Sequence, residues 1–212
     1  MAHRTGLEHY FARNLKVVTP PASEPITTTE AKNHLKVDFS DDDSYIDDLI
    51  QAARETCEQW TGRALITQTL RIKLDEFPRS IDWNTGSVNH RIRVPSPPLI
   101  AVSSIVYTDT AGASQTLSSS TYTVDSDAEP GIIVPAYGEV WPSTRTIPNA
   151  VVITYTAGYG SASDVPRALK QGMMLLIGQW YDVRQAVVTG TIATEIPMGV
   201  QALFSTVGQI KV

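Results

Sequence analysis

Apolar residues recur with helical spacing near both ends of the chain. One strongly amphipathic segment begins at Ser40, which has capping-box spacing to Asp43, and ends at Gly62, a residue suited to a helix C-cap. Another begins near Asp164, which can cap it, and is apolar nearly all round at its centre, so we expect this helix to be buried on most sides. The pair Thr27 and Glu30 repeats the capping-box spacing. The expected helices cover about residues 27–37, 40–62, 164–183 and 197–204.

Between about Ala64 and Thr156 the pattern changes to alternation of apolar and polar residues. Leu70–Leu74, with charged residues between its apolar ones, is typical of a half-buried strand, and Asp109–Gly112 of a turn between strands. Short strands separated by many turn residues predict a small antiparallel sandwich or barrel. The expected strands lie at about 70–74, 91–94, 100–107, 114–117, 122–124, 132–134 and 151–155.

These patterns predict an α+β fold in which a helical bundle is interrupted by an inserted small antiparallel β domain. The helices that flank the β segment must pack together to bury their apolar faces. We expect an extended, proline-broken arm over 1–26, a helical domain over 27–63 and 161–206, the β domain over 64–160, and a tail over 207–212. The expected helical core consists of Ile46, Leu49, Ile50, Ala53, Cys57, Trp60, Leu169, Leu176 and Trp180.

Charge and composition narrow the classes of function. The chain has 17 basic and 22 acidic residues, a net charge of −5, which argues against a protein that grips nucleic-acid phosphates. Residues 27–62 alone carry nine acidic and three basic residues. No apolar run reaches the roughly 20 residues that span a bilayer, so we expect no membrane segment, and we find no secretory signal. Cys57, the single cysteine, fits assembly in a reducing cytoplasm.

Motifs of catalysis, metal binding and cofactor binding are absent from the sequence. The acidic run Asp41–Asp48 lacks the glycine and distal glutamate of an EF-hand loop, and a helix N-terminus explains it better. The four histidines have no metal-ligand spacing, and Gly158–Gly160 lacks the Lys-Ser/Thr of a phosphate loop. Tyr137 and Trp141 are expected to lie in a loop. One interpretation is that they contact a carbohydrate or a partner protein. We favour the other, in which they anchor the loop by packing. We expect no enzyme, no cofactor and no metal.

The order of several short motifs resembles one family. Ile26–Val37, Tyr45–Ile50 and Thr61–Thr69 are similar to the opening of head–tail connector (adaptor) proteins of long-tailed phages and gene-transfer particles. The resemblance covers nearly everything from Ile26 to Leu203. It continues through Pro95–Leu99, Pro135–Gly138, Trp141–Pro142, Thr156–Gly160, Asp164–Leu169, Gly178–Tyr181, Arg184–Val188 and Ile196–Val200.

The resemblance implies a structural virion protein that assembles in the host cytoplasm. It also implies that the subunits form a ring beneath the portal, a dodecamer that matches the portal's own symmetry. Such a ring extends the DNA channel, lets DNA pass without sequence-specific binding, and docks the next neck, stopper or tail protein. We expect the C-terminal segment to contact the portal. The residues expected there are Leu203, Phe204, Val207, Ile210 and Val212.

An acidic channel wall would repel DNA phosphates and let the genome slide, so the acidic helix is the candidate lining. The residues expected there are Asp41, Asp42, Asp43, Asp47 and Asp48. Two alternatives stay open at the level of sequence. One is a tail or baseplate protein whose β domain binds carbohydrate through Tyr137 or Trp141; the other is an enzyme with a divalent metal at the acidic helix.

Overall fold

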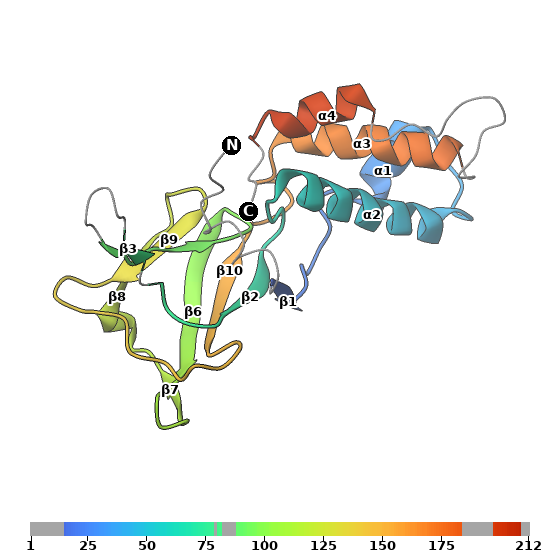
Figure 1. Cartoon of the computed structure of the whole chain (residues 1–212). Helices are drawn as coiled ribbons and strands as arrows, with labels where there is room; N and C mark the ends of the chain where they lie inside the picture. The colour runs from blue at the N-terminus through green and yellow to red at the C-terminus, as the bar shows by residue number, and fades with distance from the viewer. Residues whose placement is uncertain (1–14, 79, 82–87, 184–196, 209–212) are drawn as a thin grey trace, which may run out of the picture. The chain divides into compact units, whose positions relative to one another are not determined.

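The computed structural model describes residues 15–78, 80–81, 88–183 and 197–208 (Figure 1). The chain divides into two compact units. The helical unit is built from residues 21–66 and from the segment that begins at 159, and the β unit from residues up to 20 and 67–158. The predicted α+β class is confirmed. Within the described residues, no helix is both long enough and apolar enough to cross a membrane.

The helical unit contains helices whose ends follow the predicted signals closely. Thr27 closes a complete capping box with Glu30, and Gly62 ends the longest helix with a φ of 68°. That left-handed backbone conformation is the one that glycine adopts without steric cost. The helices are α1 (Thr28–Leu35), α2 (Asp43–Thr61), α3 (Arg167–Asp182) and α4 (Met198–Ser205).

Two predicted caps do not form. At the start of α2 the N-cap is Asp42, which makes no side-chain capping bond, and Ser40 contributes only its backbone carbonyl to the Asp43 N–H. Pro166 is the N-cap of α3, because Asp164 instead accepts hydrogen bonds from the backbone and side chain of Ser161. Both local alternatives are typical of Ser and Asp, which compete with helix capping by forming turns.

One apolar cluster forms the core of the helical unit. All of the residues expected in the core lie in it or, like Trp60 and Trp180, pack against it. Gly172 lets α3 and α4 approach closely, since a Cβ there would lie 2.5 Å from the Phe204 ring. The expected burial of α3 on most sides is wrong at Leu175, which is 40% exposed.

The β unit is a two-layer arrangement of antiparallel strands. One sheet has the order β1-β2-β10-β6-β7 and another β5-β9-β8, with the separate pair β3-β4. Both β2 and β10 alternate buried and half-buried residues, and the buried Tyr155 of β10 donates a hydrogen bond to the carbonyl of Pro95, the residue after β5, at 2.9 Å. The strands are β1 (Lys16–Thr19), β2 (Gln68–Leu74), β3 (Ser80–Ile81), β4 (Val88–Asn89), β5 (Ile92–Val94), β6 (Leu99–Thr108), β7 (Ser114–Thr116), β8 (Tyr122–Asp125), β9 (Gly131–Pro135) and β10 (Val151–Ala157).

The segment expected to be an irregular arm takes part in both units. Lys16–Thr19 forms the edge strand β1, paired with β2, which the sequence pattern did not predict. Ile26 is 1% exposed and belongs to the helical core. Four residues without apolar alternation carry too little signal for a strand, and the pairing comes from the neighbouring β2.

Candidate assembly surfaces

The acidic start of α2 is built into the helical unit. Three of the carboxylates predicted to line a channel make contacts inside the unit, although one of these, Asp47, is exposed, as are Asp41 and Asp48. These contacts therefore join α2 to α1 and α3. Each spans 2.6 Å: the Tyr181 hydroxyl donates to Asp42, Lys32 Nζ pairs with Asp43, and the Thr28 hydroxyl donates to Asp47.

The metal-site alternative gains no support from this geometry. Among the described residues, no group of three or more His, Cys, Asp or Glu side chains is arranged to hold a metal ion. Asp42, Asp43 and Asp47 each contact a hydroxyl or an ammonium group of another helix. Part of the acidic run therefore stabilises the packing of the helices.

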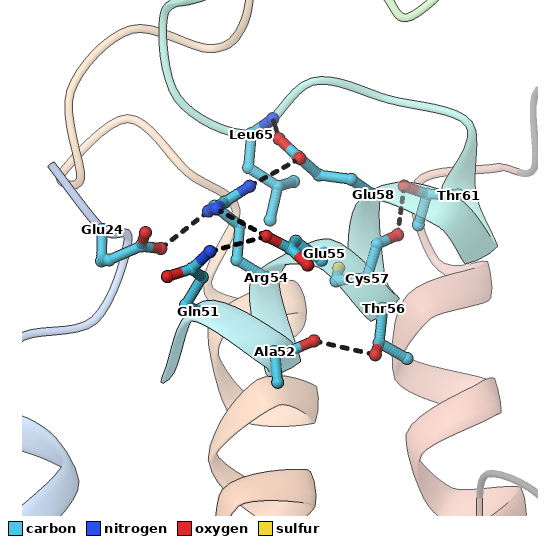
Figure 2. A network of polar contacts seen from close by, with 10 residues as sticks. All are labelled: Glu24, Gln51, Ala52, Arg54, Glu55, Thr56, Cys57, Glu58, Thr61 and Leu65. Atoms are coloured by element: carbon cyan, nitrogen blue, oxygen red, sulfur yellow. Dashed lines mark hydrogen bonds and ion pairs between the residues drawn. The ribbon is translucent and has the colours of Figure 1, made fainter. Parts of the chain in front are cut away.

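A buried arginine is the electrostatic centre of the helical unit (Figure 2). The side chain of Arg54 is 8% exposed, and its Nε donates to Glu24 at 2.7 Å while Nη1 donates to Glu58 at 3.0 Å. Glu55 lies farther away, at 3.5 Å, and is largely exposed. The second oxygen of Glu58 accepts the Leu65 backbone N–H at 2.8 Å. Arg54 thus joins the segment before α1, helix α2 and the loop after α2.

Burial and charge act in opposite directions on this group. Burial alone lowers the pKa of Arg54, but the hydrogen bonds and charges of Glu24 and Glu58 outweigh it and raise that pKa. Burial raises the pKa of Glu58, and the Leu65 N–H and Arg54 oppose the rise. Such a buried ion pair is costly to break, because removing one member leaves the other charge without compensation.

Cys57 is an inert core thiol. It is fully buried, and burial, assisted by the charge of Glu58, raises its pKa to about 12. A nucleophilic or metal-binding cysteine needs the thiolate, which this environment disfavours.

The predicted portal contact divides into buried and exposed positions. Phe204 is fully buried against α3, so it anchors α4 inside the subunit and offers no exposed contact. Leu203 and Val207 are half-buried, and the Val207 carbonyl accepts a hydrogen bond from Arg63 Nη2 at 2.8 Å. Ile210 and Val212 lie outside the described residues.

The loop after β9 holds one buried and one exposed aromatic residue. Trp141 is 2% exposed, stacks on Phe77 at a centroid distance of 4.9 Å, and donates from Nε1 to the His90 carbonyl at 2.7 Å. Tyr137 is fully exposed. Trp141 therefore anchors the loop by packing and offers no ring to a carbohydrate.

The sequence reasoning missed Arg54 and Arg63 as structural residues. Arg54 follows Ile46 and Ile50 at four-residue spacing on the apolar stripe of α2, and that position was a readable signal of a buried charge. Arg63 follows the C-cap Gly62 and has no such pattern, so only the fold identifies its contacts with Tyr159 and Val207.

Comparison with solved structures defines the class of protein. The chain is similar to a chain in the neck of an empty gene transfer agent particle computed with C6 symmetry, with 24% identity, a TM-score of 0.72, and coverage of 93% of this chain and 96% of that one. A chain in the virion of a native gene transfer agent particle has 25% identity and a TM-score of 0.71, with the same coverage. A third, in a native neck computed with C12 symmetry, has 26% identity and a TM-score of 0.67.

The sequence itself identifies the family. Residues 24–195 match the family model described as head completion protein, and the chain belongs to that family. No curated protein matches the chain. The resemblance to head–tail connector proteins is confirmed, and the chain is a structural protein of the head–tail neck of a virion.

Proposed function

We propose that this protein assembles as a ring under the portal, extends the DNA channel and docks the next neck or tail protein. The observation that carries the proposal is the match at 26% identity to a chain in a native neck computed with C12 symmetry, over 93% of this chain. A dodecamer would match a twelvefold neck. The net charge of −5 suits a channel component through which DNA slides without being held.

Within this proposal the C-terminal segment makes the portal contact. Phe204 anchors α4 in the helical core, and the bond from Arg63 to the Val207 carbonyl fixes the point from which the last residues leave. Leu203, Val207, Ile210 and Val212 then remain as contact residues. Deleting Gly208–Val212 should leave a folded protein that no longer attaches to portal-bearing heads, and full attachment by that truncation would contradict this part.

The exposed acidic residues in and just before α2 are the candidate channel lining. Asp41, Asp47 and Asp48 are exposed, but Asp47 accepts a hydrogen bond from Thr28, and the half-buried Asp42 and Asp43 have partners inside the subunit. The double substitution D41K/D48K should therefore keep the fold and slow DNA ejection. The matched control is D43N, which alters an internal contact without adding a positive charge.

The decisive functional test is loss of the protein from particle-producing cells. We expect DNA-filled heads that lack tails, seen by electron microscopy, and recovery of tail attachment when purified protein is added to those heads. Normal tailed particles in its absence would refute the proposal. Tailed particles that fail only to adsorb to cells would favour the tail or baseplate alternative.

A further inference from the structure

A rigid loop of the β unit presents an unburied aromatic side chain. Ala136 to Glu139 form a turn closed by the Glu139 N–H to the Ala136 carbonyl at 2.9 Å. Gly138 supplies the φ of 83° that the third position of a type II turn requires. Tyr137 is 107% and Val140 75% exposed.

This loop is held firmly only a few residues from the exposed tyrosine. Trp141 is buried, stacked on Phe77 and hydrogen-bonded to the His90 carbonyl. The Ala136 N–H donates to the Thr121 carbonyl at 3.0 Å. An aromatic side chain on a rigid loop loses little conformational entropy when a partner covers it, and Tyr is among the residues enriched at the energetic centres of interfaces.

A second apolar surface of the β unit lies along strand β1. Leu15 is 40%, Val17 48% and Val18 47% exposed. β1 is the last strand of its sheet in the described part of the chain, paired on one side with β2. In the register with β2, Lys16 lies opposite Arg71 and Val17 opposite Leu70, so Lys16 and Val17 point to opposite faces of the sheet at this edge. Lys16 is the one charged residue of β1.

The two surfaces are complementary in character and lie on different elements. The loop is apolar with the exposed carboxylate of Glu139, and the β1 edge has exposed apolar residues with the exposed Lys16 on the other face of the strand. The loop follows the smaller sheet, whereas β1 is the edge of the larger one (Figure 1). A closed ring of more than two identical subunits needs this arrangement, because each subunit must offer two different surfaces that fit each other.

We propose that the 136–140 loop of one subunit docks on the β1 edge of the next copy in the ring. At this edge Tyr137 and Val140 contact Val17 and Val18, and the Glu139 carboxylate pairs with Lys16 on the other side of the strand. The inference rests on the proposed ring and names the contact between its subunits. Opposite charges fix which edge receives the loop, and covering the apolar residues supplies the affinity.

The chain is well suited to a crosslinking test, because its single native thiol, Cys57, is buried and its pKa is raised to about 12. The variant V18C/V140C should form a ladder of disulfide-linked oligomers under mild oxidation. The matched control T110C/V140C places the first cysteine on an exposed turn residue at the β6–β7 end and should give no ladder. Native mass spectrometry of the same unoxidised samples reports whether rings form.

A charge exchange gives an independent readout of the same contact. E139K in the V18C/V140C background should lower the crosslinking yield about fivefold, the scale of one exposed ion pair. Adding K16E should restore the yield, which a merely structural effect of either change would not do.

The outcomes separate this inference from the ring itself. A ladder that is specific to V18C/V140C and restored by the charge exchange supports the contact. Rings without a specific ladder overturn the contact and leave the proposed function standing. Neither rings nor a ladder overturns the contact and counts against the ring. A specific ladder without closed rings supports the contact between subunits but contradicts the expected number of subunits in a ring.

Discussion

The two units differ in where they place charged and apolar side chains. In the helical unit, several charged side chains form contacts inside the unit. In the β unit, several apolar side chains are exposed on the surface. Arg54 and Asp43 hold segments of the helical unit together. The side chains of Tyr137 and Val18 are exposed to solvent and add little to the apolar core of the β unit. The difference indicates that polar groups stabilise the helical unit from within. Most of the exposed large apolar residues belong to the β unit, although the helical unit also exposes Phe39, Leu175, Val183 and Met198.

The most drastic test of this comparison removes the β unit. A protein consisting of 21–66 joined by a short flexible linker to 159–212 should be soluble and helical, because the apolar cluster of the helical unit draws on those segments alone. Starting at residue 21 omits β1, which belongs to the sheet. Circular dichroism and thermal unfolding measure the result. A shortened protein that is fully unfolded would mean that the two units share their stability.

Among single substitutions in the two units, removal of the buried arginine should have the largest effect on the free energy of unfolding. R54M leaves Glu58, whose side chain is only 17% exposed, without its positively charged partner. Breaking a buried pair in this way costs about 3–5 kcal/mol, measurable by urea unfolding. The matched control E55Q alters an exposed partner 3.5 Å away, and should stay within about 0.5 kcal/mol of the parent. A loss below about 1 kcal/mol for R54M would show that the network is not structural.

The same variant should have an unusual pH dependence. Burial raises the folded-state pKa of Glu58 above its unfolded value, and losing Arg54 raises it further. Protonation of Glu58 therefore favours the folded state, so the deficit of R54M should be largest at neutral pH and shrink as the pH falls through that pKa. Urea unfolding of R54M and the parent at several pH values measures it. A deficit that grows in acid would contradict the assignment.

In the β unit the matching test separates the anchor of the loop from its tip. W141F keeps a ring to stack on Phe77 but leaves the His90 carbonyl without its donor, which should cost about 1–3 kcal/mol. Y137S changes a fully exposed side chain and should cost less than about 0.5 kcal/mol while weakening assembly. Equal losses of stability for both variants would remove the distinction between anchor and contact residue.

The smallest effect should come from the acidic start of α2. The carboxylate of Asp43 is 42% exposed, so its pair with Lys32 is partly screened by solvent. D43N should cost about 0.2–1 kcal/mol, and salt should reduce the difference. D48N, at an exposed position of the same run, should have no measurable effect on unfolding. A large loss of unfolding free energy for D48N would show that the acidic residues at the start of α2 stabilise the fold together.

Most helices and strands could be predicted because local signals and the final packing agree. The capping box at Thr27, the C-cap Gly62 and the alternation in β2 each reflect a choice made within a few residues. β1 could not be predicted, since its pairing depends on β2, about fifty positions later in the chain. The site was predicted less well. Acidic residues signalled an exposed face, but the partners of Asp42 and Asp43 come from other helices, and only the fold brings them together.

The most direct test of the central claim is a cryo-EM reconstruction of the neck of a particle that contains this chain. We predict a ring of identical copies related by rotational symmetry, placed between portal and tail, with residues 136–140 of each copy against strand β1 of its neighbour. A ring with other subunit contacts would contradict the docking inference alone. Density for this chain at the tail tip or baseplate, or its absence from the neck, would contradict the account as a whole.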